Sequence, residues 1–196
     1  LNDAYRRDLM SGITELVSVS TSGQAGNRLS FHPVISGNGM RVAFATQATD
    51  LTATPDDNNV TDVYLRDFGS NATVLVSKVP GGSAAGQSAS GTPVFSADGT
   101  HLLFISIATD LTGNDTNGKQ DVFLWSAATD ANELISVNLA GNAPGNGFSG
   151  ITAASMSGDL SQIVFFSEAS DVASGDTNGA ADIFLRNRTE NITTLI

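Results

Sequence analysis

The chain has 196 residues and a formal net charge of −11, from nine Lys and Arg against 20 Asp and Glu. This acidity argues against a nucleic-acid-binding protein, because phosphate binding needs a basic face. Cysteine is absent, which excludes disulfides and cysteine-ligated zinc. The hydrophobic runs are too short for a membrane span, so we expect none. Abundant Gly, Asn, Asp, Ser and Thr indicate short strands joined by polar loops.

A unit of about 60 residues repeats along the chain. Its clearest marker is an Asp that opens an apolar, aromatic strand, and the intervals between copies are 59, 59 and 61 residues. The marker recurs at Asp3, Asp62, Asp121 and Asp182. Upstream of the last three copies, a turn that begins with Ser36, Ser96 or Ser157 leads into a second apolar strand. Several independent positions therefore share one period.

Each complete unit is predicted to contain four short strands. In the middle unit they cover roughly 92–96, 101–106, 121–125 and 132–137, which are rich in Val, Ile, Leu and Phe and bounded by turn residues. Four antiparallel strands repeated along a chain are typical of a β-propeller, in which each unit is a blade. We therefore predict an all-β fold, a β-propeller built of four-stranded antiparallel blades. A β-sandwich is the alternative, but it does not require a regular period.

The repeat divides the chain into about three and a half blades. The predicted boundaries are a half blade at 3–20, followed by blades at 33–79, 92–137 and 153–196, which together make a single partial propeller. Three and a half blades do not close a ring, because propellers contain at least four. We therefore expect the chain to need further blades, either from the same gene or from another chain.

The middle unit resembles a known family. Ser96-Ala-Asp-Gly, then Leu102-Leu-Phe, then Asp121-Val-Phe-Leu are similar to the TolB-like propeller repeat, which has Ser-Pro-Asp-Gly, an apolar strand and Asp-Ile-Tyr. The resemblance covers nearly the whole chain and implies a propeller fold, but it implies little about function. Two features depart from the family: the blades here are longer, and Leu160 takes the place of the turn Gly in the last unit.

Two sets of long loops are predicted to emerge on one face of the propeller, because strands alternate in direction within a blade. They follow the second strand (47–61, 107–120, 168–181) and the fourth strand (21–32, 80–91, 138–152) of each unit. Loops of this length are often functional, so this long-loop face is the candidate binding face.

The loops after the second strand contain a repeated pattern of oxygen-bearing side chains. Alternating Asp and Asn followed by Gly at a sharp turn suit a hard cation such as Ca²⁺. The predicted ligands are Asp115, Asn117 and Asp121 and their copies Asp176, Asn178 and Asp182. The alternative is that these side chains only cap turns through neighbouring backbone N–H groups. Asp50, Asp110 and Asp171 are expected to close the base of each loop by accepting backbone hydrogen bonds.

Catalytic patterns are weak. His32 and His101 fall at different repeat positions, and Ser149 lacks the second Gly of a nucleophile elbow. Trp125 is expected either to pack or to lie at an exposed strand edge, with sugar stacking as the alternative role. We therefore predict that the chain is not an enzyme and has no catalytic residues.

The sequence as a whole favours a non-enzymatic extracytoplasmic propeller. It would act as a binding or scaffold module that contacts a protein or a surface polysaccharide through its long-loop face, and calcium would stabilise it. One alternative is a carbohydrate-binding or glycoside-hydrolysing propeller, and another is a subunit of an extracellular fibre or surface assembly. The acidic, cysteine-free composition, with only two Lys, favours an extracellular or periplasmic bacterial protein.

Overall fold

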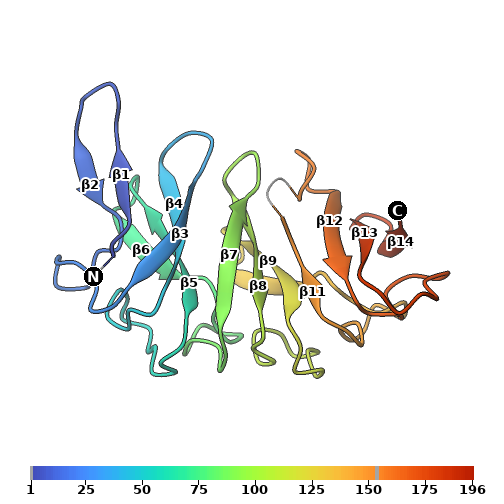
Figure 1. Cartoon of the computed structure of the whole chain (residues 1–196). Helices are drawn as coiled ribbons and strands as arrows, with labels where there is room; N and C mark the ends of the chain where they lie inside the picture. Colours follow the sequence, from blue (N-terminus) through green and yellow to red (C-terminus); the bar gives the residue numbers. More distant parts are fainter. Residues whose placement is uncertain (1, 153–154) are drawn as a thin grey trace.

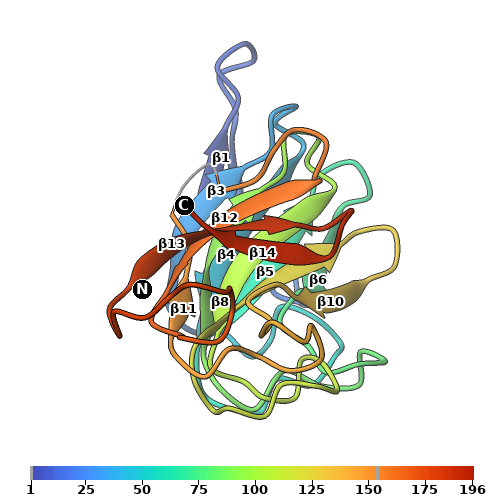
Figure 2. The same cartoon turned by 90° about the vertical axis from the view of Figure 1, so that its right-hand side faces the viewer.

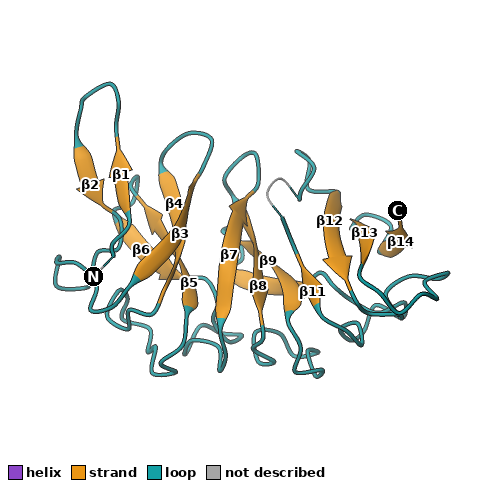
Figure 3. Cartoon of the chain, viewed as in Figure 1, coloured by secondary structure: helices purple, strands orange, loops and turns teal. Residues whose placement is uncertain are grey.

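The computed structural model describes residues 2–152 and 155–196, and this part of the chain consists of strands and loops without a helix (Figure 3). Its strands form a two-stranded sheet and three four-stranded sheets, in each of which strands adjacent in sequence pair antiparallel.

The half blade contains β1 (Tyr5–Arg7) and β2 (Thr14–Leu16). The first blade contains β3 (Ser30–Ile35), β4 (Arg41–Thr46), β5 (Asp62–Asp67) and β6 (Ala72–Leu75). The second blade contains β7 (Ser90–Phe95), β8 (His101–Ser106), β9 (Asp121–Ser126) and β10 (Ala131–Leu134). The third blade contains β11 (Ser149–Gly150), β12 (Gln162–Ser167), β13 (Asp182–Asn187) and β14 (Ile192–Leu195). The predicted fold class, four-stranded antiparallel propeller blades, is confirmed.

The sheets stand side by side in chain order, so the two termini lie at opposite ends of a row (Figure 1). Short hairpin turns project from one side of the row, at the top of Figure 1, and the long loops project from the other. The long-loop face predicted from strand alternation is therefore present, and it runs along the whole row.

The first strand of each full blade begins two to four residues earlier than predicted, at Ser30, Ser90 and Ser149 instead of 33, 92 and 153. In the first two blades the strand continues through a β-bulge: the pairing register shifts between Phe31 and Val34 in the first blade and between Gly91 and Val94 in the second. Pro33 and Pro93 lie inside these two strands, because a bulge accommodates a residue without an N–H. The predicted start at 153 lies outside the described residues.

The turn between the first two strands explains the repeated Ser-x-Asp/Asn motif. The Ser96 hydroxyl donates to Asp98 Oδ1 at 2.7 Å, and the same carboxylate oxygen accepts the Thr100 N–H at 3.0 Å. Gly99 follows with a φ of +70°, and Leu160 adopts +62° at the equivalent position of the third blade. The third blade therefore keeps the turn geometry without the Gly. The positive φ strains the backbone there, because the left-handed region is unfavourable for a residue with a Leu side chain.

Three hydrophobic clusters of described residues hold the row together, and each joins two adjacent sheets. At every junction a pair of stacked aromatic rings from the second and third strands of one blade packs against the preceding sheet. These pairs are Phe44–Tyr64, Phe104–Phe123 and Phe165–Phe184, with ring centroids 6.2, 5.7 and 5.8 Å apart. The rings are fully buried or nearly so, which makes the junctions the main hydrophobic core.

Each blade also presents a forward face to the next blade. The forward-face side chains are Ala43, Val63, Leu65 and Val76 in the first blade, Leu103, Val122, Leu124 and Ile135 in the second and, by repeat position, Val164, Ile183, Leu185 and Ile196 in the third. The first two sets are buried, but Val164, Ile183 and Ile196 are 38%, 47% and 72% exposed. Figure 2 shows β12, β13 and β14 facing the viewer in front of the other sheets. The forward face of the third blade is therefore an open, apolar sheet face.

The opposite end of the row is open as well. Tyr5 occupies the repeat position of Tyr64, Phe123 and Phe184, which are all fully buried, but Tyr5 itself is 59% exposed. The half blade supplies β1 and β2 without the two inner strands that complete the other blades. Both ends of the row thus keep the residues of a blade junction without the second blade.

No helix in the described residues has the length and apolar character needed to cross a lipid bilayer.

Candidate functional site

The long-loop face is tied together by a clamp that repeats at each blade junction. The amide N–H of Asn27, Gln87 or Asn146 donates to Oδ1 of the aspartate at the base of the next long loop, Asp50, Asp110 or Asp171, at 3.0, 3.0 and 2.8 Å. The prediction that these aspartates accept backbone hydrogen bonds is confirmed. A Gly precedes each donor because the loops approach closely: a Cβ at Gly86 would lie 2.6 Å from Leu111 Cδ2.

In the first two blades, the marker aspartates at the start of the third strands, Asp62 and Asp121, are buried and hydrogen-bonded on both oxygens. In the second blade, Ser136 donates to Asp121 Oδ1 at 2.6 Å and Asn117 Nδ2 donates to Oδ2 at 2.8 Å. In the first blade Ser77 and Asn58 bind Asp62 in the same way, at 2.6 and 2.7 Å. The structure therefore brings the predicted ligands Asn117 and Asp121 together, with the amide nitrogen of Asn117 directed at the carboxylate.

The serine partners were missed in the sequence, although the signal was present. Ser77 and Ser136 end the repeated Leu-Val-Ser and Leu-Ile-Ser motifs, and Ser18 ends the first copy. The Ser18 hydroxyl donates to Asp3 Oδ1 at 3.0 Å, so the half blade keeps the same pair. Two motifs with a common period thus form one hydrogen-bonded unit between the third and fourth strands.

Burial raises the pKa of both Asp62 and Asp121 to about 7, even though their Ser and Asn donors favour the charged form. Neither carboxylate is accessible to solvent. Both groups therefore change charge near neutral pH inside the protein.

We expect the Asp62→Asn substitution to flatten the pH dependence of stability. The pKa of Asp62 rises from 3.8 to about 7 on folding. The contribution of Asp62 to the free energy of unfolding is therefore fully present below about pH 4 and is lost as the pH rises through 7. From pH 5 to pH 8 the free energy of unfolding of the native chain should fall by roughly 2–3 kcal/mol relative to that of the variant. Urea unfolding of both proteins across this range measures the difference. Asp57→Asn, at an exposed neighbour, controls for the removed charge, and a difference that does not change with pH would contradict the expectation.

The aspartates in the middle of the long loops behave differently. Asp56 Oδ2 accepts a 2.6 Å hydrogen bond from the Tyr64 hydroxyl and only its Oδ1 is buried without a partner, whereas both oxygens of Asp115 are buried without one. Asp56 and Asp115 are 2% and 4% exposed, and burial raises the pKa of each. An unpaired buried carboxylate is unfavourable, so Asp115 is the least satisfied acidic group of the second blade.

The third-blade copy is only partly formed. The side-chain oxygen of Asn178 accepts the Ala180 N–H at 2.8 Å, as Asn117 accepts the Lys119 N–H at 2.7 Å. One oxygen each of Asp176 and Asp182 is buried without a partner. The six predicted ligands thus divide into three that cap turns or bind each other, Asn117, Asp121 and Asn178, and three that retain unpaired oxygens, Asp115, Asp176 and Asp182. Within the described ranges, no group of three acidic or histidine side chains has a metal-binding arrangement, and the calcium assignment stays a prediction.

The residues considered for catalysis belong to three different blades, with His32 in β3, His101 in β8 and Ser149 in β11. His32 is exposed in the β3 bulge, and the Nδ1 of His101 lies 2.8 Å from the Thr100 hydroxyl in a hairpin turn. Ser149 is buried, with its hydroxyl 2.9 Å from that of Ser167. Trp125 is 3% exposed and its Nε1 donates to Asp130 at 3.1 Å, so of the two predicted placements the packed one is confirmed and the exposed edge is wrong.

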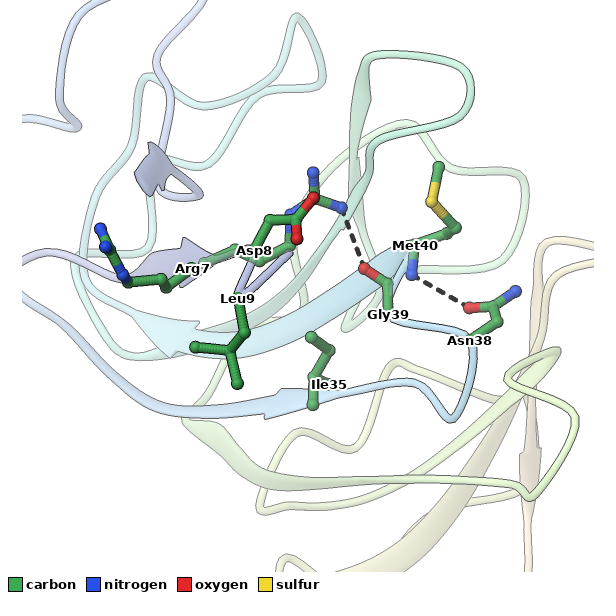
Figure 4. Close-up of a pocket in the computed structure, with 8 residues that line it drawn as sticks. Arg7, Asp8, Leu9, Ile35, Asn38, Gly39 and Met40 are labelled. Carbon is green, nitrogen blue, oxygen red and sulfur yellow. Dashed lines mark hydrogen bonds between the residues drawn. The ribbon is translucent and has the colours of Figure 1, made fainter. Parts of the chain in front are cut away.

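A hollow of about 340 Å³ lies where the half blade meets the first blade, on the side of the short turns (Figure 4). It contains none of the predicted site residues. Arg6 crosses its edge and donates to the Gly39 carbonyl at 2.9 Å, and Leu9 and Ile35 line the space. The guanidinium of Arg6 also lies 3.6 Å from the centre of the Phe68 ring. The hollow therefore lies at the half-blade end of the row.

Comparisons with known proteins identify the fold alone. No protein-family model and no curated protein sequence matches the chain. A solved prolyl endopeptidase matches 98% of the chain with a TM-score of 0.59 and 15% identity, and a putative TolB from Agrobacterium tumefaciens matches 98% with a TM-score of 0.56 and 15% identity. TolB from Acinetobacter baumannii matches 95% with a TM-score of 0.50 and 13% identity. The chain spans 25%, 53% and 35% of these three proteins. Over nearly its whole length, the chain is structurally similar to the β-propeller domains of TolB-like and prolyl-oligopeptidase-type proteins.

Proposed function

We propose that the chain is part of a larger extracytoplasmic β-propeller that acts as a non-enzymatic binding or scaffold module through its long-loop face. The observation that carries the proposal is the repeated clamp at each junction, in which an aspartate at the base of one loop accepts a backbone N–H of the neighbouring loop. These acidic side chains hold the loops in position, which makes the face a stable platform for a partner. Its partner is a protein or a surface polysaccharide.

An extracellular or periplasmic bacterial location is part of the same proposal. It is supported by the acidic, cysteine-free composition and by the fold similarity to TolB from two bacteria. The similarity to a prolyl endopeptidase is the argument for an enzyme as the alternative function. That match has 15% identity and covers a quarter of the enzyme. A glycosidase needs a pair of carboxylates that can act on the substrate. The carboxylates of the clamps and of Asp62 and Asp121 are already bound by backbone or side-chain donors.

We expect no hydrolase activity from the purified chain. Incubation with a panel of chromogenic glycosides and fluorogenic peptides should release product at the rate of the buffer alone. Turnover that a single Asp→Asn substitution abolishes would contradict the binding role and favour the carbohydrate-active alternative.

We also expect the 20.2 kDa chain to associate in solution, because both ends of the row expose residues of a blade junction. Size-exclusion chromatography with light scattering should give a mass above that of the monomer. A charge at the centre of the open face, Ile183→Glu, should shift the population toward the monomer, because burying that charge is unfavourable. Thr189→Glu, at an exposed turn position, is the control and should leave the distribution unchanged. A sharp monomer with cooperative unfolding would contradict the requirement for further blades.

The same measurement tests the fibre alternative. Open, heterologous contacts between identical chains grow without limit as concentration rises, whereas a closed ring stops at a fixed size. Species that lengthen with concentration would favour a fibre or surface assembly, and a discrete mass would favour a closed propeller.

A further inference from the structure

The buried aromatic residue on the third strand is Tyr64 in the first blade but a phenylalanine in the second and third blades. In the first blade the Tyr64 hydroxyl donates to Asp56 Oδ2 at 2.6 Å, and the Thr52 hydroxyl also approaches the phenol. Burial raises the pKa of Tyr64, so the phenol stays protonated and remains a donor to the carboxylate. The phenolic oxygen therefore lies against the Asp56 carboxylate with the Thr52 hydroxyl nearby, and Thr52 itself donates to the Thr54 carbonyl at 3.2 Å.

The second blade has the same residue types, Thr and Asp, at these repeat positions but lacks the phenol. Phe123 replaces Tyr64, while Asp115 and Thr112 stand at the repeat positions of Asp56 and Thr52. Phe123 stacks on Phe104 as Tyr64 stacks on Phe44, with interplanar angles of 24° and 23°, so the ring has kept its orientation. The hydroxyl that donates to Asp56 Oδ2 in the first blade is therefore missing, so Asp115 has two unpaired oxygens where Asp56 has one.

The polar atoms left behind are unsatisfied. Both carboxylate oxygens of Asp115 and the hydroxyl of Thr112 are buried without a hydrogen-bond partner. The Asn117 amide lies close enough to favour the charged form of Asp115, but it makes no well-formed hydrogen bond. Asp115 is 96% buried, so solvent does not replace the missing donor. A buried carboxylate in this state requires a proton, a water molecule or a cation.

We propose that the Asp115 carboxylate and the Thr112 hydroxyl bind a calcium ion on the side of the carboxylate that the Tyr64 hydroxyl faces in the first blade. Carboxylate and hydroxyl oxygens are hard ligands of the kind that calcium prefers, and its flexible coordination suits a loop site completed by carbonyl oxygens or water. Asp110 and Asp121 both add negative potential at Asp115, which favours a cation over a neutral water molecule. Asn117 and Asp121 shape the loop as hydrogen-bonded turn residues.

The third blade is a weaker version of the same site. Phe184 again lacks the hydroxyl and Asp176 keeps one buried oxygen without a partner, but Ala173 takes the place of Thr112 and Asp176 is only half-buried. The inference therefore assigns the tighter site to the second blade and none to the first. It does not depend on the proposed binding role of the long-loop face.

The test restores the missing hydroxyl. In equilibrium dialysis against radioactive calcium, which counts bound ions whatever the association state, the native chain should bind calcium in preference to magnesium. Phe123→Tyr should lose one equivalent of bound calcium, because the new phenol occupies the site and donates to Asp115. Asp115→Asn should lose the same equivalent and confirms the result if Phe123→Tyr folds poorly.

The reciprocal substitution is the matched control. Tyr64→Phe creates an unpaired Asp56 in the first blade, so its thermal midpoint should fall in chelator and recover in part with calcium. Native-level calcium binding by Phe123→Tyr, or equal binding of magnesium by the native chain, would overturn the assignment. A native chain that binds no calcium, together with a Phe123→Tyr midpoint that rises in chelator, would show that the site holds water.

Discussion

Replacing Phe104 with Ala is expected to lower the free energy of unfolding by about 3–5 kcal/mol, the usual cost of truncating a buried phenylalanine. Phe104 is fully buried, stacks on Phe123 at 5.7 Å, and belongs to the cluster that joins the first and second blades. The cavity would lie between two sheets whose backbones are fixed by their own strand pairing, so little collapse can fill it. A thermal midpoint lower by roughly 10 °C is the expected reading.

The control for this substitution is Ile107→Ala, one residue beyond the end of the same strand. Ile107 is 45% exposed, so its truncation removes less buried surface and leaves no internal cavity. Its effect should stay within about 1 kcal/mol. Equal effects of the two substitutions would mean that the blade junction is not the main source of stability.

Replacing Gly147 with Ala should destabilise the third blade by roughly 3 kcal/mol, through overpacking rather than a cavity. A Cβ at this position would lie 2.6 Å from both Ala169 N and Glu168 C, and 2.8 Å from Ala169 Cα. All three are backbone atoms of the loop that follows β12, so no side-chain rotation relieves the contact. The Phe148 carbonyl nearby accepts the Glu168 N–H at 2.8 Å, and separating the two segments would strain that hydrogen bond.

Gly158→Ala provides the comparison in the same blade. Gly158 has open space around its Cβ position, and Ala97 occupies the equivalent place in the second blade. We expect a change between zero and about 1 kcal/mol of stabilisation, because Ala restricts the unfolded chain. Differential scanning fluorimetry of the two Gly variants measures the contrast. A Gly147→Ala midpoint equal to that of the native chain would mean that the two loops separate freely.

The blades were predictable because their pattern is local and repeated. Asp121 through Ser126 pair with His101 through Ser106 in an unbroken register, and the apolar residues of both strands were visible in the sequence. The starts of the first strands were predicted less well. There a bulge lets Pro33 and Pro93 lie inside strands, and a bulge depends on the pairing partner rather than on the residues that form it.

The candidate site was predictable in its residues but not in their partners. The sequence places Asp115, Asn117 and Asp121 in one loop, but it does not reveal that Asn117 donates to Asp121 while Asp115 remains unpaired. The difference between Tyr64 and Phe123 is plain in the repeat, yet it looks like a conservative exchange of packing residues. Only the 2.6 Å contact from the Tyr64 hydroxyl to Asp56 shows that one oxygen atom separates the two sites.

Each hydrophobic cluster joins only two adjacent sheets, and this arrangement determines how the chain unfolds. Coupling only between neighbours makes the row behave as a one-dimensional array, in which disruption starts at an end and proceeds sheet by sheet. The half blade has a single neighbour and two short strands, so amide hydrogen exchange should be fastest there and slowest in β8 and β9. Closing the row into a ring would give every sheet two neighbours and remove the ends at which unravelling begins.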